Sequence, residues 1–178
     1  MESDDLTLVR RARLGDHAAF HELVDRHGPG LLRLAASLVG NVADAEDIVQ
    51  ETFSGAFRGL GGFRGGSSVR TWLTRILIRQ TAGFRRKRKR AIDLLQARPS
   101  LADRQEAPAS QAADTRMDVT AAVLALPLEY REVVVLRELQ GLSYEEIADV
   151  LDIPRGTVDS RLFRARRAMQ ELLKEYLG

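Results

Sequence analysis

The side chains best suited to chemistry lie near the C-terminus, and that chemistry is recognition of a charged polymer rather than bond making. The segment from Leu142 to Ala168, LSYEEIADVLDIPRGTVDSRLFRARRA, has the layout of a helix-turn-helix with a tight turn at 152–154. Ala148 supplies the small side chain that lets two crossed helices approach. The second helix would present groups suited to base edges and phosphates in the major groove of duplex DNA. These groups are Arg155, Thr157, Asp159, Ser160, Phe163, Arg164 and Arg167.

The alternative for this segment is an ordinary helical hairpin with a solvated basic face. Residues 119–153 carry seven acidic side chains against two basic ones, whereas residues 154–178 carry six basic against three acidic. The basic residues therefore begin where a recognition helix would begin, which favours DNA binding.

A second candidate nucleic-acid site lies in the middle of the chain. The stretch GLGGFRGGSS at 59–68 is predicted to be a loop, and a long helix is expected from Val69 into the basic run RRKRKR at 85–90. Aromatic rings and arginines beside a flexible loop are typical of sites for single-stranded nucleic acid. For Trp72, burial in the core is an equally good interpretation. The candidates are Phe63, Arg64, Arg70, Thr71, Trp72, Arg75, Arg79, Arg85 and Arg86.

An acidic helix provides a third surface. In DAEDIVQETF, at 44–53, the residues Asp44, Asp47, Gln50 and Glu51 recur at the three- and four-residue spacing of one helix face. Such a face can serve solubility alone. It can also dock a basic helical partner protein.

Catalytic chemistry finds little support in the sequence. His17 and His21 stand four apart, a spacing that could share one metal ion, but the sequence places no third ligand and we interpret both as surface residues. The glycine-rich loop lacks the Gly-Lys-Ser/Thr of a Walker loop. The chain has no cysteine, which excludes thiolate chemistry and agrees with a reducing compartment. We therefore expect no enzyme activity, no cofactor and no metal.

The elements that position these surfaces are predicted to be helices throughout, because no segment alternates with period two. Asp16 is a plausible N-cap for a helix that Gly28-Pro29-Gly30 should break or kink, and another helix should begin near Ala43. Pro127 should stop one helix and start the next, and Ser143 with Glu146 has the pattern of a capping box.

The chain of 178 residues divides at a stretch rich in Ala, Ser, Gln and Pro, at 98–118, which has no apolar period and reads as a flexible linker. We therefore predict an all-α protein of two small helical domains, the second with the helix-turn-helix. The net charge of +2 conceals this division, since residues 61–97 hold ten basic side chains against one acidic. No apolar run reaches 18 residues, so we expect no membrane insertion and a cytoplasmic location.

In this order the motifs resemble the extracytoplasmic function (ECF) type of bacterial RNA polymerase sigma factor. The resemblance is carried by DAEDIVQETF, FRGGSSVRTWLTRI, the basic run and LPLEYREVVVLRELQGLSYEEIADVLDIPRGTVDSRLFRARRAM. It implies sigma region 2 over 5–97, a flexible linker over 98–114 and sigma region 4 over 115–178. It also implies promoter-specific initiation with core RNA polymerase, and an anti-sigma factor as a further partner.

The resemblance assigns a role to each surface. It implies that Asp44, Asp47, Gln50, Glu51 and Phe53 dock on the polymerase clamp. It implies that the loop from Phe63, with Arg64, Ser67 and Ser68, and the helix from Val69 melt the minus-10 promoter element and capture a flipped base. The helix from Arg155 would read the minus-35 element as duplex DNA, and the C-terminal unit would rest on the polymerase flap.

Three positions depart from the family pattern. Asp159 stands where many members have a basic residue, and a carboxylate accepts from cytosine N4 but repels phosphate, so an unusual minus-35 sequence is expected. Arg79 and Gly83 stand where Asn and Asp are frequent in the minus-10 helix of the family. These two positions therefore bear on the identity of the captured base. Two other hypotheses stay open from the sequence: a stand-alone helix-turn-helix regulator and, less favoured, an enzyme acting on nucleic acid.

Overall fold

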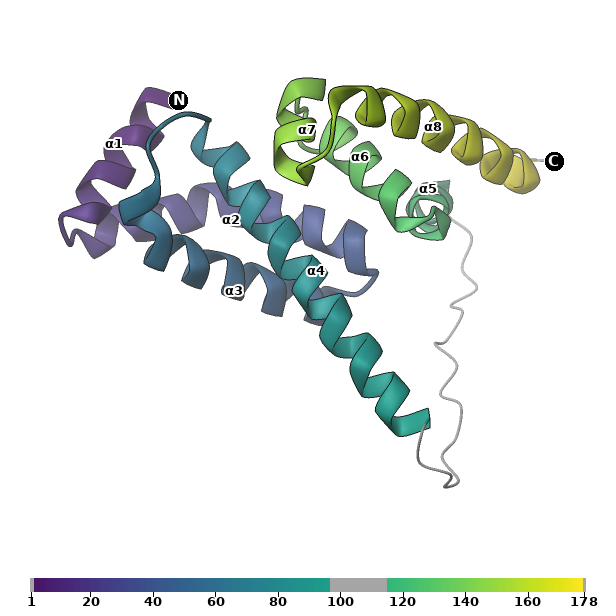
Figure 1. Cartoon of the computed structure of the whole chain (residues 1–178), viewed down its shortest axis with the longest axis horizontal. Coiled ribbons are helices and arrows are strands. Elements are labelled where there is room, and N and C mark those ends of the chain that lie inside the picture. The colour runs from purple at the N-terminus through teal and green to yellow at the C-terminus, as the bar shows by residue number, and fades with distance from the viewer. Residues whose placement is uncertain (1, 97–114, 178) are drawn as a thin grey trace.

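The structure, a computed structural model, describes residues 2–96 and 115–177, and helices make up nearly all of it (Figure 1). No strand occurs in those ranges, which confirms the all-α prediction. The predicted linker lies outside the described residues over 98–114, and its extension to 118 is wrong, because a helix begins at Thr115. No helix within them is both long enough and apolar enough to cross a bilayer. The elements are α1 (Glu2–Arg13), α2 (His17–Val39), α3 (Val42–Gly59), the 3-10 turn η1 (Leu60–Gly62), α4 (Val69–Gln96), α5 (Thr115–Ala125), α6 (Leu128–Glu138), α7 (Tyr144–Leu151) and α8 (Arg155–Leu177).

Helices α1 to α4 form an N-terminal unit in which side-chain caps fix where each helix starts. Asp16 caps α2 by accepting from the Ala19 amide at 3.1 Å, as the sequence predicts. Asn41 accepts from the Asp44 amide at 2.7 Å and starts α3. Helix α4 begins at Val69, the predicted position.

The predicted break at Gly28-Pro29-Gly30 is wrong, because α2 runs unbroken through Pro29. A proline inside a helix removes one backbone hydrogen bond. Leu23, before the proline, and Leu31, after it, are both buried, so one apolar stripe continues across the site. Burial of that stripe against α1 and α3 outweighs the lost bond.

Helix α1 was not anticipated from the sequence. It packs on α2 and buries Leu8, Val9 and Ala12. Its acidic and then basic composition masks this narrow apolar stripe.

Helices α5 to α8 form a C-terminal unit with the predicted helix-turn-helix at α7 and α8. Pro127 stands at the start of α6, and the capping box of α7 is complete: Ser143 Oγ accepts from the Glu146 amide at 3.2 Å, and Glu146 Oε2 accepts from the Ser143 amide at 2.8 Å. Asp152 adopts the left-handed conformation, with φ of 55°, which turns the chain into α8.

The two units lie directly against each other, with α5 and α6 packed on α2 and with α7 packed on α4 (Figure 1). Their buried side chains form one continuous hydrophobic core. Gly40, with φ of 87°, ends α2 where an added Cβ would lie 3.5 Å from a methyl carbon of Leu124 on α5. The predicted division into two units therefore coexists with a shared interface that the sequence did not reveal.

Candidate nucleic-acid interface

The glycine-rich loop ahead of α4 is held in place by Arg13, at the end of α1. Its guanidinium donates from Nε to the Leu60 carbonyl at 2.8 Å, from Nη2 to the Gly61 carbonyl at 2.9 Å, and from Nη2 to the Phe63 carbonyl. A planar guanidinium that donates to three backbone carbonyls within four residues fixes a loop that glycines would otherwise leave free. Arg13 is thus a positioning residue for the loop, and the sequence reasoning missed it because its partners lie almost fifty residues away.

The two aromatic residues of the candidate site pack on each other. The ring centroids of Phe63 and Trp72 are 4.8 Å apart, with 39° between the ring planes. Phe63 is buried, with 7% of its surface exposed, and Trp72 is half-buried against the core. In this conformation the Phe63 ring packs against the Trp72 ring. The two side chains therefore form an aromatic pair between the loop and the first turn of α4.

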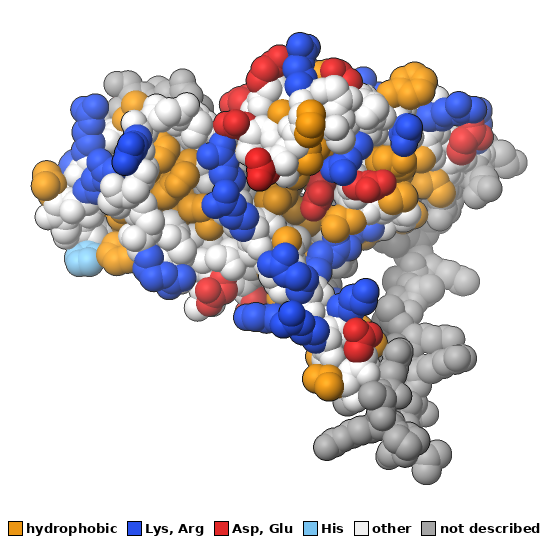
Figure 2. All heavy atoms as spheres, in the orientation of Figure 1, with side chains coloured by type: hydrophobic (Ala, Val, Ile, Leu, Met, Phe, Trp, Pro, Cys, Tyr) orange, Lys and Arg blue, Asp and Glu red, His pale blue; other side chains and the backbone are white. Residues whose placement is uncertain are grey.

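Helix α4 presents a band of cations beyond the loop. Figure 2 shows Lys and Arg side chains following the diagonal of α4 and its projecting end. Arg64, Arg70, Arg79 and Arg86 are exposed, whereas Arg85 is half-buried. Of the remaining candidates, Ser67 and Ser68 are half-buried, and Ser68 caps the first turn by accepting from the Thr71 amide at 3.0 Å.

Two of the predicted α4 residues are engaged by the C-terminal unit. Thr71 Oγ1 donates to Glu146 Oε1 at 3.0 Å, and Arg75 Nη2 pairs with Asp149 Oδ2 at 2.7 Å. Thr71 is 1% exposed. The pKa of Glu146 is lowered, first by the Ser143 amide that its carboxylate accepts from and also by the Thr71 hydroxyl. The structure thus brings α7 against the surface expected to meet melted DNA.

Helix α8 exposes most of the side chains that are predicted to read duplex DNA. Of the residues predicted to contact DNA, Thr157 is half-buried and the rest are exposed. Phe163 has 69% of its surface exposed. Val158, between them, is fully buried and anchors the helix on its unit. Arg155 Nε pairs with Glu145 Oε1 at 3.0 Å across the turn. The exposed members are Arg155, Asp159, Ser160, Phe163, Arg164 and Arg167.

The acidic surface on α3 lies beside an apolar groove. Asp47, Gln50 and Glu51 are exposed, whereas Asp44 is half-buried and pairs with Arg88 at 3.1 Å. Phe53 is buried at 8% exposure. Gln50 and Phe53 line the groove between α2 and α3, together with Phe20, Val24, Gly28, Leu32, Glu46, Val49 and Ser54.

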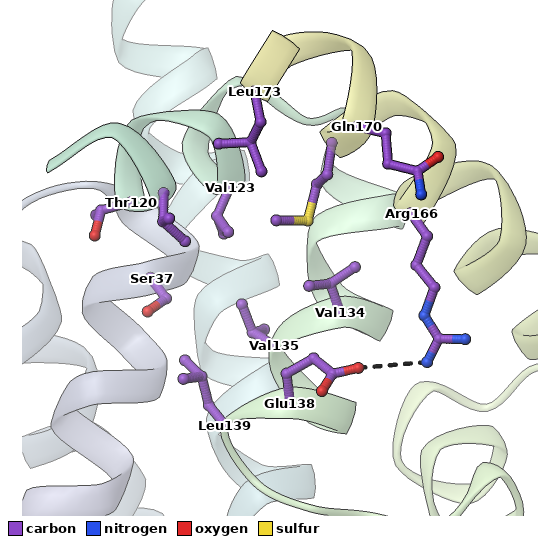
Figure 3. A pocket seen from close by; sticks show the side chains of 12 residues that line it. Ser37, Thr120, Val123, Val134, Val135, Glu138, Leu139, Arg166, Gln170 and Leu173 are labelled. Carbon is purple, nitrogen blue, oxygen red and sulfur yellow. Dashed lines mark hydrogen bonds and ion pairs between the residues drawn. The ribbon is translucent and has the colours of Figure 1, made fainter. Parts of the chain in front are cut away.

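A second apolar groove lies on the C-terminal unit beside the end of α2 (Figure 3). Its volume is about 500 Å³, and its walls come from the end of α2 and from α5, α6 and α8. Val123, Val134 and Leu173 point into it, and the Arg166–Glu138 ion pair, at 3.4 Å, closes one side. A groove of this composition suits an apolar segment of another protein.

The interface between the units also rests on two polar side chains, the half-buried Arg131 and the buried Gln140. Arg131 Nη1 donates to the Leu38 carbonyl of α2 at 2.8 Å, and its Nη2 donates to the carbonyls of Leu124 and Leu126. Gln140 Nε2 donates to the Gly30 carbonyl at 3.3 Å. Burial, and secondarily the nearby Arg85, lowers the pKa of Arg131.

Comparison with known proteins matches both units to one family. Residues 23–91 match the family described as Sigma-70 region 2, and residues 116–169 match Sigma-70, region 4. The chain is 36% identical to the ECF RNA polymerase sigma-E factor of Escherichia coli K12, over 93% of this chain and 92% of that protein. It is 35% identical to the RNA polymerase sigma-H factor of Pseudomonas aeruginosa, over 99% of this chain and 97% of that protein.

Two solved structures share the fold. The sigma factor RpoE of Bartonella quintana, in complex with the anti-sigma factor NepR, aligns with a TM-score of 0.73 and 32% identity, over 87% of this chain and 96% of that one. CnrH, in complex with the cytosolic domain of CnrY, aligns with a TM-score of 0.71 and 29% identity, over 97% of this chain and 98% of that one.

Proposed function

The chain belongs to the ECF RNA polymerase sigma factors, which direct promoter-specific transcription initiation, and we propose how its surfaces divide that work. The N-terminal unit, over 5–97, docks on core polymerase and opens the minus-10 element, and the C-terminal unit, over 115–178, reads the minus-35 element. The observation that carries this proposal is the separation of one acidic and two basic surfaces onto different helices, α3, α4 and α8.

Core docking is assigned to α3. The exposed Asp47, Gln50 and Glu51 provide carboxylate and amide groups beside the apolar groove that Phe53 lines. A basic amphipathic helix could place apolar side chains in that groove and cations on its acidic rim, which is the chemistry expected of a coiled-coil partner such as the polymerase clamp. Because Phe53 is buried, it would shape the groove floor rather than provide an exposed contact. The C-terminal unit would add a second contact, with the polymerase flap.

Minus-10 recognition is assigned to the glycine-rich loop and α4. Exposed arginines on α4 can follow the phosphates of a single strand, and the Phe63–Trp72 pair can wall a pocket for an extruded base. Arg13 holds the loop in the geometry that such a pocket needs. The departures at Arg79 and Gly83 lie on the same helix and would tune which base is accepted.

Minus-35 recognition is assigned to α8. The exposed residues predicted to contact DNA combine Arg155, Arg164 and Arg167 with Ser160, Phe163 and Asp159. Arginines position the helix on phosphates, and Asp159 at its centre can accept from cytosine N4. The proposed role is therefore binding and specificity, and the polymerase supplies the chemistry of RNA synthesis.

An anti-sigma factor is the proposed regulatory partner, in the cytoplasm. The two structural relatives are described as complexes with an anti-sigma factor or with the cytosolic domain of a partner protein. The groove of Figure 3 is largely apolar and is lined by the C-terminal unit, with Ser37 of α2 at its edge, so an apolar segment of that partner could bind there.

In vitro transcription tests the proposed function. The purified chain is mixed with bacterial core polymerase on a library of promoter templates, and core polymerase alone and chain alone serve as controls. Transcripts that start at defined positions only when both are present support a sigma factor. Tight, specific binding of duplex DNA by the chain alone, without any directed transcript, would favour a stand-alone regulator instead.

A further inference from the structure

We propose that Asp5, near the start of α1, is a positioning residue for minus-10 recognition. Asp5 fixes the position of α1 on α2, and α1 in turn contacts the glycine-rich loop near both of its own ends. The side chain would therefore act through α1 and the loop, without contact to DNA. The inference rests on the proposed role of this loop in receiving an extruded base.

Helix α1 lies along the glycine-rich loop and contacts it at two places (Figure 1). At the C-terminal end of the helix, Arg13 donates to three backbone carbonyls between Leu60 and Phe63. Nearer the N-terminal end, Leu6 lies beside Gly65, where an added Cβ would stand 3.9 Å from Leu6 Cδ2. Two contacts about two helical turns apart fix both the position and the direction of the loop relative to α1.

The loop itself contains little that would hold its shape. Five glycines fall within residues 59–66. Added Cβ atoms at Gly61, Gly62 and Gly66 would meet nothing within 4 Å, so no neighbour packs tightly on the backbone there. Glycine backbone has the most conformational freedom to lose. The geometry of the loop therefore depends on where α1 stands.

Asp5 fixes where α1 stands on α2. The residue is 7% exposed, and its Oδ1 accepts from Arg26 Nη1 at 2.7 Å while its Oδ2 accepts from His27 Nε2 at 2.9 Å. An ionised carboxylate only accepts hydrogen bonds, and burial without donors is costly, so both oxygens require these two α2 side chains. Because Leu6 is the next residue, a shift of α1 that breaks these bonds also moves Leu6 away from Gly65.

The attachment of α1 and its exact placement come from different contacts. Leu8, Val9 and Ala12 are buried and attach α1 to α2 through apolar area. Apolar burial has no preferred direction, so small aliphatic side chains allow α1 to slide or tilt. Charge-assisted hydrogen bonds do have a preferred geometry. Asp5 therefore controls the placement of α1, which is the property that the loop depends on.

The fluorescence of Trp72, the one tryptophan of the chain, tests the placement of the loop. The Trp72 ring centroid lies 4.8 Å from that of Phe63, in the loop. In the free full-length chain, Asp5→Ala should increase quenching of Trp72 by acrylamide, because Phe63 would no longer cover the ring. The matched control is Asp4→Ala, which removes an exposed carboxylate from the same helix. Equal quenching in both variants would overturn the proposal.

Template binding tests the consequence for recognition. Holoenzyme is bound to a promoter from which the wild type initiates, with an abasic site placed in turn at each nontemplate position of the minus-10 element. At the captured position the wild type should lose affinity by about tenfold, as expected for one base stacked on aromatic side chains. Asp5→Ala should reduce this loss to under about threefold, with unchanged affinity for the abasic template. Equal weakening on every template would indicate a merely structural role and contradict the proposal.

A second variant keeps the test decisive if circular dichroism shows that Asp5→Ala does not fold. Arg26 is exposed, so Arg26→Met removes one of the two donors to Asp5 and keeps the apolar stem. It should increase Trp72 quenching and reduce base discrimination in the same way. The control is Arg33→Met, at another exposed position of α2. No difference between these two variants would overturn the positioning role.

The wild type distinguishes failure of this inference from failure of the proposed function. If it discriminates at one abasic position while Asp5→Ala discriminates equally well, the role of Asp5 is wrong and base capture stands. If the wild type initiates transcription but no abasic position affects binding, base capture itself is refuted, and with it the inference.

Discussion

Arg131 of α6 donates a hydrogen bond to the backbone carbonyl of Leu38, in the last turn of α2, at 2.8 Å. The same guanidinium also serves carbonyls at the end of α5, so one side chain ties together helix ends from both units. Carbonyls at the end of a helix lack partners within the helix, and the half-buried Arg131 guanidinium satisfies them here.

Replacing Arg131 should destabilise the interface between the two units. We expect Arg131→Met, which keeps much of the apolar stem, to lower the free energy of unfolding by about 1–3 kcal/mol, because buried carbonyls lose their donor. Thermal unfolding followed by circular dichroism measures the change. Arg161→Met, on α8, is the control, and an equal effect of both variants would contradict a special role for Arg131.

Removing the loop clamp should impair promoter opening. Arg13→Ala deletes three hydrogen bonds to the glycine-rich loop, and we expect promoter melting to fall by about tenfold, or roughly 1.4 kcal/mol, while core binding is unchanged. Permanganate reactivity of unpaired thymines measures melting. The exposed Arg10→Ala, also on α1, is the control, and normal melting by Arg13→Ala would exclude the positioning role.

The acidic face of α3 should determine affinity for core polymerase. Asp47→Ala combined with Gln50→Ala should weaken core binding by about tenfold or more, since both side chains are exposed and neither is in the hydrophobic core. Binding to core polymerase is measured by a titration with labelled protein. Asp4→Ala, an exposed acidic position on α1, serves as the control. Unchanged affinity would refute the docking assignment.

Asp159 should read sequence in the minus-35 element. Asp159→Arg removes an acceptor and adds a donor at an exposed position of α8, so the preferred base pair should change while the melting temperature does not. Selection from a promoter library measures the preference. If wild type and variant select the same minus-35 sequences, this side chain does not contact bases.

Acid should weaken the capping of α7 and, to a smaller extent, its hydrogen bond with Thr71 of α4. The pKa of Glu146 lies below its ordinary value of 4.5, first because its carboxylate accepts from the Ser143 amide. A carboxyl whose pKa is depressed in the folded state adds stability above the unfolded pKa and loses it as pH falls through the folded value. Glu146→Gln should therefore cost under about 1 kcal/mol at neutral pH, allowing for solvent screening, and progressively less below pH of about 4.5. Chemical denaturation at several pH values checks this, and a cost independent of pH would contradict it.

Local signals allowed much of the fold to be predicted from the sequence. The N-cap at Asp16, the capping box of Ser143 and Glu146 and the restart at Pro127 each depend on residues within a few positions of one another. The family resemblance rests on motifs of the same kind, and the matches to Sigma-70 regions 2 and 4 confirm it. The break predicted at Pro29 failed because a local penalty was outweighed by packing between distant helices.

The sequence by itself determined most of the helices, the sigma family and the three charged surfaces, because periodicity, caps and charge blocks are properties of short stretches. Only the tertiary structure decided which surfaces are free. Arg13 meets the glycine loop, and Thr71 and Arg75 meet Glu146 and Asp149, across about fifty to seventy-five positions of chain. Nothing in the spacing of residues encodes such partners, since they arise when whole helices pack and bury their apolar stripes. That packing places the acidic helix α7 of the C-terminal unit against the basic helix α4 of the N-terminal unit.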